Sequence, residues 1–208
     1  MMKKIVGILC VFAILYSLPA ILSGDDEDVE VNLEVYEKAT FAGGCFWCVQ
    51  PPYDKLEGVI KTTVGYTGGK EQNPTYKQVA YGKTTHTEAI EVIYDPTVVG
   101  YDKLLEVFWM NIDPTDLGGQ FVDRGSQYRP EIFYHSEEQR IIAKNSKEKL
   151  NNSGRFDRPV VVPITEATTF WKAEEYHQKY YKKSPVGYYA YRKGSGRDQF
   201  INKYWPSK

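Results

Sequence analysis

Residues 43–48 read Gly-Gly-Cys-Phe-Trp-Cys, so two glycines lead into two cysteines that lie three positions apart. The residues just before them, 38–42, are typical of a short strand, and glycine lets the backbone turn sharply and approach a substrate closely. If a helix follows, the positive end of its dipole favours the thiolate form of Cys45. Pro51 and Pro52 break helix interiors, so we expect this helix either to be kinked or to begin near Pro51. The stretch predicts a nucleophilic Cys45 with a second thiol, Cys48, within reach.

The first 24 residues are typical of a signal peptide or a membrane anchor. Lys3 and Lys4 precede an apolar run over residues 5–22, and small residues follow at a possible cleavage site. The run is also about long enough to span a bilayer if it is retained. Cys10 lies inside this run and is interpreted as a signal or membrane residue. Residues 25–36 are interpreted as an acidic linker, and the localisation expected for the domain at 37–208 is extracytoplasmic, either secreted or anchored through residues 5–22.

Cysteine usage in the predicted domain favours chemistry over structural support. Cys45 and Cys48 are its two cysteines, and a spacer of two residues closes too small a loop to stabilise a fold strongly. A zinc site needs about four ligands, and the three histidines at 86, 135 and 177 have no recognisable spacing with this pair. We therefore expect no metal and no cofactor. The formal net charge of −1 gives no reason to expect a nucleic-acid partner.

The remaining pattern predicts an α+β fold. Strands are expected at 58–66, 87–94, 129–134 and 160–168, and helices at 75–81, 102–112, 136–150 and 171–182, with a long, polar loop at 113–129 and no clear period after 182. Ser136 and Gln139 form the capping-box pattern of a helix start. We expect a two-layer sandwich with a mixed, mostly antiparallel sheet of ferredoxin-like type.

One strand carries a candidate general acid. In residues 87–94, the period of two places Glu88 on the same face as Ile90, Val92 and Tyr94. A carboxyl group on an apolar face has a raised pKa and holds its proton near neutral pH. Alternation alone therefore predicts that Glu88 is protonated and able to donate.

Six motifs in order now resemble a known family. They are Gly-Cys-Phe-Trp at 44–47, Val-Gly-Tyr-Thr-Gly-Gly at 64–69, Asn-Pro-Thr-Tyr at 73–76, His-Thr-Glu-Ala at 86–89, Tyr-Asp-Pro at 94–96 and Asp-Arg-Gly-Ser-Gln-Tyr-Arg at 123–129. Together they resemble the peptide methionine sulfoxide reductase A family, from about Ala39 to Tyr191. The resemblance implies an enzyme that reduces the S-epimer of methionine sulfoxide, free or in proteins.

The resemblance also implies roles for the first motif and for the predicted acid. Cys45 falls on the residue that attacks the sulfoxide sulfur, and Phe46 and Trp47 fall on the aromatic residues that hold the S-methyl group. Sulfur makes favourable contacts with aromatic rings. Glu88 falls on the glutamate that protonates or hydrogen-bonds the sulfoxide oxygen.

Three further residues are implied by the same comparison. Tyr76 and Tyr128 fall on the tyrosines whose hydroxyls bind the sulfoxide oxygen. Asp123 falls on a loop aspartate that supports the site indirectly or contacts the substrate backbone. His86 is kept out of the catalytic set, because a histidine at a strand start is satisfied by local contacts about as often as it is functional.

Cys48 departs from the commoner pattern of this family. Many members have glycine at this position and place resolving cysteines near the carboxyl terminus, but this chain has no cysteine after Cys48. We therefore predict that Cys48 resolves the Cys45 sulfenic acid as a disulfide, which a thioredoxin-like reductant then reduces. Two alternatives stay open: a thiol–disulfide oxidoreductase built on Cys45 and Cys48, and a protein that binds oxidised methionine without reducing it.

Overall fold

The computed structural model describes residues 35–206, and the predictions for residues 1–24 and for most of the linker at 25–36 lie outside this part. Its main feature is a six-stranded sheet in the order β7-β6-β1-β3-β2-β8. All neighbouring strands are antiparallel except β6 and β7. In residues 35–206, no helix combines the length and the apolar character needed to cross a bilayer.

The centre of the sheet has the ferredoxin-like arrangement. The chain runs through β1 (Glu37–Gly43), α1 (Phe46–Asp54), β2 (Val59–Thr67), β3 (Thr87–Tyr94), α3 (Tyr101–Met110) and β6 (Pro130–Tyr134). Within this core the strand order is β6-β1-β3-β2, which is the order of a split βαβ fold. The predicted fold class, an α+β sandwich with a mostly antiparallel sheet, is confirmed.

Strand β3 alternates between two environments, as its sequence predicts. Ile90, Val92 and Tyr94 belong to the main core, where they pack with residues of β1 and α3. Ala89 lies in a separate small cluster with Ala42 and Phe133. Strand β3 lies between β1 and β2, so its backbone is paired on both edges. Pairing on both edges makes β3 a well-protected place in the sheet for a functional side chain.

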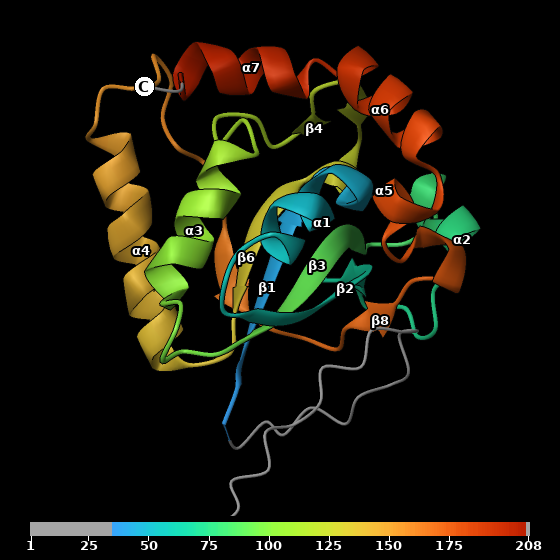
Figure 1. The fold of residues 1–208 in the computed structure, drawn as a ribbon, viewed down its shortest axis with the longest axis horizontal. Helices are drawn as coiled ribbons and strands as arrows, with labels where there is room; N and C mark the ends of the chain where they lie inside the picture. Colours follow the sequence, from blue (N-terminus) through green and yellow to red (C-terminus); the bar gives the residue numbers. More distant parts are fainter. Residues whose placement is uncertain (1–34, 207–208) are drawn as a thin grey trace, which may run out of the picture. The chain divides into compact units, whose positions relative to one another are not determined.

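Helices α1 and α3 lie across one face of the sheet, and α4 (Glu137–Asn151) packs beside α3 and against β6 and β7 (Figure 1). Between the helices and β1, the ring of Phe41 stacks with those of Tyr53 and Phe108. The Ser136 hydroxyl accepts from the Gln139 N–H, as predicted. The Gln139 side chain accepts from His135 N–H rather than from Ser136 N–H, so the capping is not reciprocal.

The long polar region predicted as a loop contains short elements. They are β4 (Gly119–Gln120), β5 (Asp123–Arg124) and the 3-10 turn η1 (Ser126–Tyr128), while α2 (Tyr76–Ala80) confirms the short helix predicted near residue 75. Strands β4 and β5 pair with each other and not with the main sheet. The hairpin brings Asp123 and Tyr128 to the end of the sheet where α1 begins.

Two predictions near the carboxyl end are wrong. Residues 171–182 are not one helix: β8 (Trp171–Lys172) pairs with β2, the 3-10 turn η2 (Glu175–His177) follows, and α5 (Tyr180–Lys183) is a separate short helix. Pairing with the free edge of β2 overrides the helical pattern, and Lys179 has φ of 51°, which ends any continuous helix. The strand predicted at 160–168 is reduced to β7 (Ile164–Glu166).

Two helices were not predicted at all. They are α6 (Pro185–Gly194) and α7 (Arg197–Tyr204), which lie beyond the sheet end nearest to α1 (Figure 1). Proline at the first position and basic residues in the last turn of α6 are ordinary helix signals. Most residues of α6 are exposed, α7 is exposed or half-exposed, and each helix has one buried side chain, so neither presents the broad apolar face of a core helix.

Candidate active site

Cys45 lies between the end of β1 and the first residue of α1, where it caps the helix. Gly44 makes this turn possible, because its φ is 78° and an added Cβ would lie 2.6 Å from the Gln120 Cβ. The helix begins at Phe46, so the expectation that it might begin near Pro51 is wrong. Cys45 therefore lies at the positive end of the helix dipole, although it is 93% buried, being only 7% exposed.

One of the two prolines inside α1 is compensated by a contact from another helix. Pro52 has no N–H to donate to the carbonyl oxygen of Cys48, four residues earlier. Arg192 of α6 donates to that oxygen instead, from Nη1 at 3.1 Å. A side chain from the end of the chain thereby replaces a missing bond in the helix that carries both cysteines.

The two thiols are hydrogen-bonded to each other and have different electrostatic surroundings. Burial raises the pKa of the Cys45 thiol well above its usual value, and the bond to Cys48 adds to this. The bond from Cys45 lowers the pKa of Cys48 to about 7; burial opposes this, and the charges of Arg197 and Arg192 assist it. Both cysteines are free thiols in this structure. Despite the helix dipole, the thiolate of the resting pair is therefore favoured on Cys48.

Glu88 projects from β3 toward the same turn. Its side chain is buried, and its Oε2 accepts from the Phe46 N–H at 3.0 Å. Burial is the main cause that raises the pKa of Glu88 to about 8, so the carboxyl group is mostly protonated at neutral pH. The arrangement places a proton donor at the start of the helix that follows Cys45.

Phe46 and Trp47 form an aromatic wall beside the thiol. Phe46 is buried and packs with Tyr66. The Trp47 ring stacks on Tyr180 at 4.0 Å, and its Nε1 donates to His177 Nδ1 at 3.0 Å. Burial lowers the pKa of His177 to about 4, so the ring is neutral and can accept this bond. The indole orientation is therefore fixed from two sides.

Tyr76 and Tyr128 enter from two short elements, α2 and η1. Burial raises the pKa of Tyr76 to about 12, and it raises that of Tyr128 as well; the charge of Glu88 adds to both. Both hydroxyls therefore stay protonated and lie near Glu88. The Tyr76 N–H donates to Glu174 Oε1 at 2.8 Å, which holds the start of α2.

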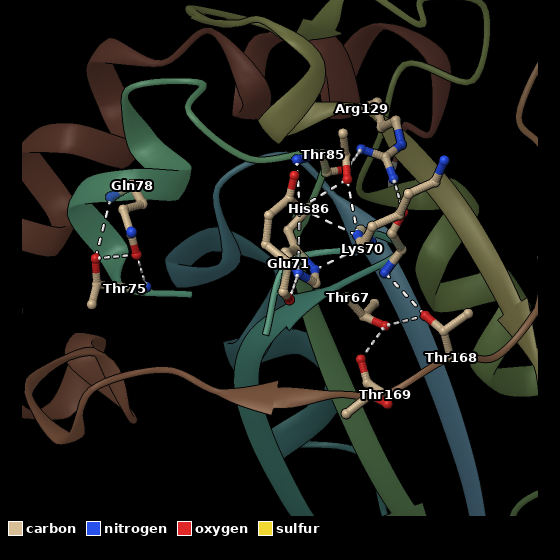
Figure 2. Close-up of polar contacts among 12 residues, drawn as sticks. Thr67, Lys70, Glu71, Thr75, Gln78, Thr85, His86, Arg129, Thr168 and Thr169 are labelled. Carbon is tan, nitrogen blue, oxygen red and sulfur yellow. Dashed lines mark hydrogen bonds and ion pairs between the residues drawn. The ribbon is translucent and has the colours of Figure 1, made fainter. Parts of the chain in front are cut away.

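His86 is satisfied by local contacts, in agreement with its exclusion from the catalytic set. Its Nδ1 accepts from Gly69 N–H at 3.2 Å and its Nε2 lies 2.7 Å from the Glu71 carbonyl oxygen. Figure 2 shows this network together with Arg129, whose guanidinium bonds to the carbonyl oxygen of Thr85. These contacts hold the loops that carry Tyr76 and Tyr128.

Asp123 is connected to Cys45 through a residue that the sequence analysis missed. The Tyr191 hydroxyl of α6 donates to Asp123 Oδ2 and is also hydrogen-bonded to the Cys45 thiol. Burial raises the pKa of Asp123, while Tyr191 and the charge of Arg197 oppose that rise. Asp123 is thus connected to the thiol pair through Tyr191.

The structure brings every predicted site residue to one end of the sheet. These residues are Cys45, Phe46, Trp47, Cys48, Tyr76, Glu88, Asp123 and Tyr128. It adds a second group, His177, Tyr191, Arg192 and Arg197, from the region between β8 and the end of α7. Helix signals could have located α6, but nothing in the sequence says which of its side chains turn toward Cys45. Among residues 35–206, no cluster of three or more His, Cys, Asp or Glu side chains could hold a metal ion.

Comparisons with known proteins agree on one family. The family described as peptide methionine sulfoxide reductase matches residues 37–208. The peptide methionine sulfoxide reductase MsrA of Listeria innocua is 58% identical over 172 residues, which is 83% of this chain and 97% of that protein. The corresponding protein of Bacillus licheniformis is 53% identical over 175 residues, or 84% of this chain and 97% of that protein.

Solved structures give the same result. Reduced Mxr1 from Saccharomyces cerevisiae superposes with a TM-score of 0.72 at 30% identity, covering 77% of this chain and 92% of that one. Methionine sulfoxide reductase A of Corynebacterium diphtheriae has a TM-score of 0.64 at 33% identity, covering 74% and 77%. With the family match across the whole domain, the chain belongs to the peptide methionine sulfoxide reductase family.

Proposed function

We propose that this protein reduces the S-epimer of methionine sulfoxide, free or within proteins, with Cys45 as nucleophile and Glu88 as general acid. The observation that carries the proposal is the placement of Glu88. Its carboxyl group is buried, mostly protonated at neutral pH, and bonded to the N–H of the residue after Cys45. Reduction of a sulfoxide requires a proton donor close to a thiol nucleophile.

In the first step, the Cys45 sulfur attacks the sulfoxide sulfur while Glu88 protonates the oxygen. The hydroxyls of Tyr76 and Tyr128 bind the same oxygen as charge develops on it. Oxygen then passes to Cys45, the thioether leaves, and Glu88 recovers its proton. Cys45 is oxidised by two electrons, the substrate sulfur is reduced by two, and the thiol proton is retained in the sulfenic acid.

Phe46 and Trp47 hold the S-methyl group in this proposal. Both rings adjoin Cys45 in sequence, and Trp47 is fixed by Tyr180 and His177. An apolar wall favours the methyl group over a charged or hydrated one. Asp123 supports the site through Tyr191.

Cys48 resolves the sulfenic acid in the second step. Its thiol is already hydrogen-bonded to Cys45, and its pKa near 7 makes thiolate available at neutral pH. A thioredoxin-like dithiol then reduces the disulfide by exchange. Yeast Mxr1, a protein of the same fold, has been solved in complex with Trx2. A pure thiol–disulfide oxidoreductase is the weaker alternative, because it gives no role to the buried acid or to the two tyrosines.

The test uses the two epimers of methionine sulfoxide with dithiothreitol as reductant. We expect the wild-type protein to reduce the S-epimer alone and Cys45→Ser to lose all activity. Cys48→Ser should still form one methionine per enzyme in a single turnover, but should lose steady-state activity with a thioredoxin-like donor. Disulfide exchange without sulfoxide reduction would overturn the assignment, and full steady-state activity of Cys48→Ser would remove Cys48 from its role.

We also propose that the domain acts outside the cytoplasm, secreted or anchored through residues 5–22. The basic start and the apolar run support this. Fractionation of cells that express the full chain, with amino-terminal sequencing of the product, tests it. A product with an intact amino terminus in the cytoplasmic fraction would contradict both versions.

A further inference from the structure

Arg197 is a buried cation next to the thiol pair. It is the first residue of α7 and 1% exposed. Its Nη2 donates to the Gly43 carbonyl oxygen at 3.1 Å, and its Nη1 donates to the Asn111 carbonyl oxygen. The same Nη2 lies 3.1 Å from the position that a Cβ on Gly44 would occupy. The guanidinium therefore packs directly against the turn that presents Cys45.

This cation has no directly paired counter-ion in the part of the chain that the structure describes. Arginine stays charged in proteins, and burying an unpaired charge is strongly unfavourable. Arg197 forms no ion pair within residues 35–206; its bonded partners are neutral carbonyl groups, and its buried Nε has no partner. The guanidinium carbon lies 4.7 Å from the ring centroid of Phe121, which is also a neutral contact. A buried, unpaired guanidinium would be stabilised by an anion that forms next to it during the reaction cycle.

Two acidic groups feel the charge of Arg197, and they are Asp123 and Cys48. Asp123 already accepts a hydrogen bond from Tyr191, and its pKa is raised on balance by burial. The pKa of Cys48 is instead lowered, with Arg197 as the largest charge effect after the hydrogen bond from Cys45. Cys48 is fully buried, whereas Asp123 is only half-buried and already accepts the Tyr191 hydroxyl, so Cys48 is the better candidate for the missing anion.

Arg192 provides a comparison within the same region. It also acts on Cys48, but it is paired with Asp198 at 2.8 Å, and one of its donors is bonded to the Cys48 carbonyl oxygen. Its charge is already neutralised in every state of the cysteines. Unlike Arg192, Arg197 is therefore stabilised only when Cys48 is a thiolate.

We propose that Arg197 is a positioning residue for the resolving step, in which its buried guanidinium serves as the counter-ion of the Cys48 thiolate. The proposal rests on the proposed role of Cys48. The thiolate attacks the sulfur of the Cys45 sulfenic acid, an S–S bond forms, the S–O bond breaks, and hydroxide leaves and takes a proton to become water. The sulfenic sulfur is reduced and the Cys48 sulfur is oxidised, so no other reactant is needed.

The same charge affects the return reaction. The disulfide is neutral, whereas the reduced pair carries a thiolate that Arg197 stabilises. A group that stabilises the reduced form makes the disulfide easier to reduce. Arg197 therefore speeds formation of the disulfide from the sulfenic acid, by raising the fraction of Cys48 thiolate. It also shifts the later exchange with a dithiol donor toward the reduced pair.

The first experiment compares Arg197→Met with Arg197→Lys, which keeps the charge. Single turnovers without reductant are followed at about pH 6, with methionine formation and loss of free thiols measured separately. We expect Arg197→Met to slow the loss of free thiols by roughly three- to tenfold more than it slows methionine formation. In this variant less Cys48 is present as thiolate, and the higher nucleophilicity of the remaining thiolate offsets this only in part. A sulfenic acid that reacts with dimedone should accumulate, and Arg197→Lys should recover most of the rate.

The second experiment leaves Arg197 and its hydrogen bonds in place, so it also serves if Arg197→Met does not fold. Phe121→Asp gives the guanidinium a permanent anion, and Phe121→Asn is the neutral variant of the same size. Phe121 has φ of 59°, which Asp and Asn tolerate. We expect Phe121→Asp alone to raise the pKa of Cys48 from about 7 by roughly one unit, measured by thiolate absorbance, and to slow disulfide formation.

Several neighbouring groups also affect the titration of Cys48. Cys45, Arg192, Arg197 and Asp123 act on Cys48, and Glu88 and Tyr188 feel it in turn. Each of these is the same in the Asp and Asn variants, so their difference isolates the new charge. Equal titration curves and equal disulfide rates in the two variants would overturn the proposal. If the wild-type protein forms no Cys45–Cys48 disulfide after turnover, the proposed role of Cys48 fails first.

Discussion

The site has two sides that the chain builds in different ways. The core side consists of Cys45, Phe46 and Glu88, held by the β1–α1 turn and by β3. The tail side consists of His177, Tyr191, Arg192 and Arg197, from the region between β8 and the end of α7. Each of the core-side residues touches the reacting atoms in the proposed reaction, whereas three of the four tail-side residues act on charge or orientation.

The two sides differ in how their residues are held in place. Core-side positions are set by backbone pairing on both edges of β3 and by a glycine turn, so their geometry is rigid. Tail-side residues reach the site from η2, α6 and α7, and they supply hydrogen bonds to Cys48, Trp47 and Asp123. Changes on the core side should therefore abolish chemistry, and changes on the tail side should tune it.

The largest effect is expected for Glu88→Gln. Loss of the proton donor should slow the first step by about 10²- to 10⁴-fold, as is usual for a general acid. Because the pKa of Glu88 is near 8, the wild-type carboxyl group loses its proton as pH rises through 8. The ratio of the wild-type rate to the Glu88→Gln rate should therefore fall over this range. Single-turnover rates between pH 6 and 10 measure this; a ratio that is independent of pH would contradict the assignment.

The same substitution tests stability. A carboxyl group whose folded pKa is raised contributes stability below its unfolded pKa, near 4.5, and loses it as pH rises through about 8. Glu88→Gln should remove this loss and make unfolding less dependent on pH in that window.

The next effect concerns the turn beneath Cys45. Gly44→Ala should lower the free energy of unfolding by roughly 1–3 kcal/mol, because φ is positive and Gln120 occupies the space a methyl group needs. Gly154→Ala is the matched control: its φ is also positive, but no atom lies within 4 Å of the added Cβ. Denaturant unfolding of both variants should show a clearly larger loss for Gly44→Ala; equal losses would mean that crowding by Gln120 is unimportant.

A smaller effect is expected on the tail side for Tyr191→Phe. The change removes the hydrogen bonds that Tyr191 makes to half-buried Asp123 and to the Cys45 thiol, and it should slow the first step by about three- to thirtyfold. Tyr189→Phe, in the same helix but 66% exposed, is the control and should behave as wild type. A loss of rate as large as that of Glu88→Gln would show that the two sides do not differ in their importance for the first step.

The smallest effect is expected for His177→Phe. The variant keeps an aromatic ring but removes the acceptor of the Trp47 N–H, a bond worth about 1 kcal/mol. We expect KM for the sulfoxide to rise about fivefold while kcat changes less, and His177→Asn to restore part of the affinity. A fall in kcat with unchanged KM would show that Trp47 is not held for substrate binding.

The sequence predicted the core side well, for local reasons. Alternation in β3 identified Glu88 and its apolar surroundings, and paired glycines located the turn at Cys45. The helix predicted at 171–182 is wrong because residues 171 and 172 pair with the edge of β2, which no local period encodes. Helix α6 does carry local helix signals, but its contact with α1 through Arg192 is decided only in the folded chain.

By itself, the sequence determined the motif order, the alternation of β3 and the presence of two close thiols. Only the tertiary structure decided which thiol is favoured as thiolate. The helix dipole pointed to Cys45, but burial outweighs it, and the hydrogen bond from Cys45 together with Arg192 and Arg197 shifts the charge to Cys48. Those arginines lie about 150 residues away along the chain, and the effect of a charge depends on distance and burial in space, which no local pattern encodes.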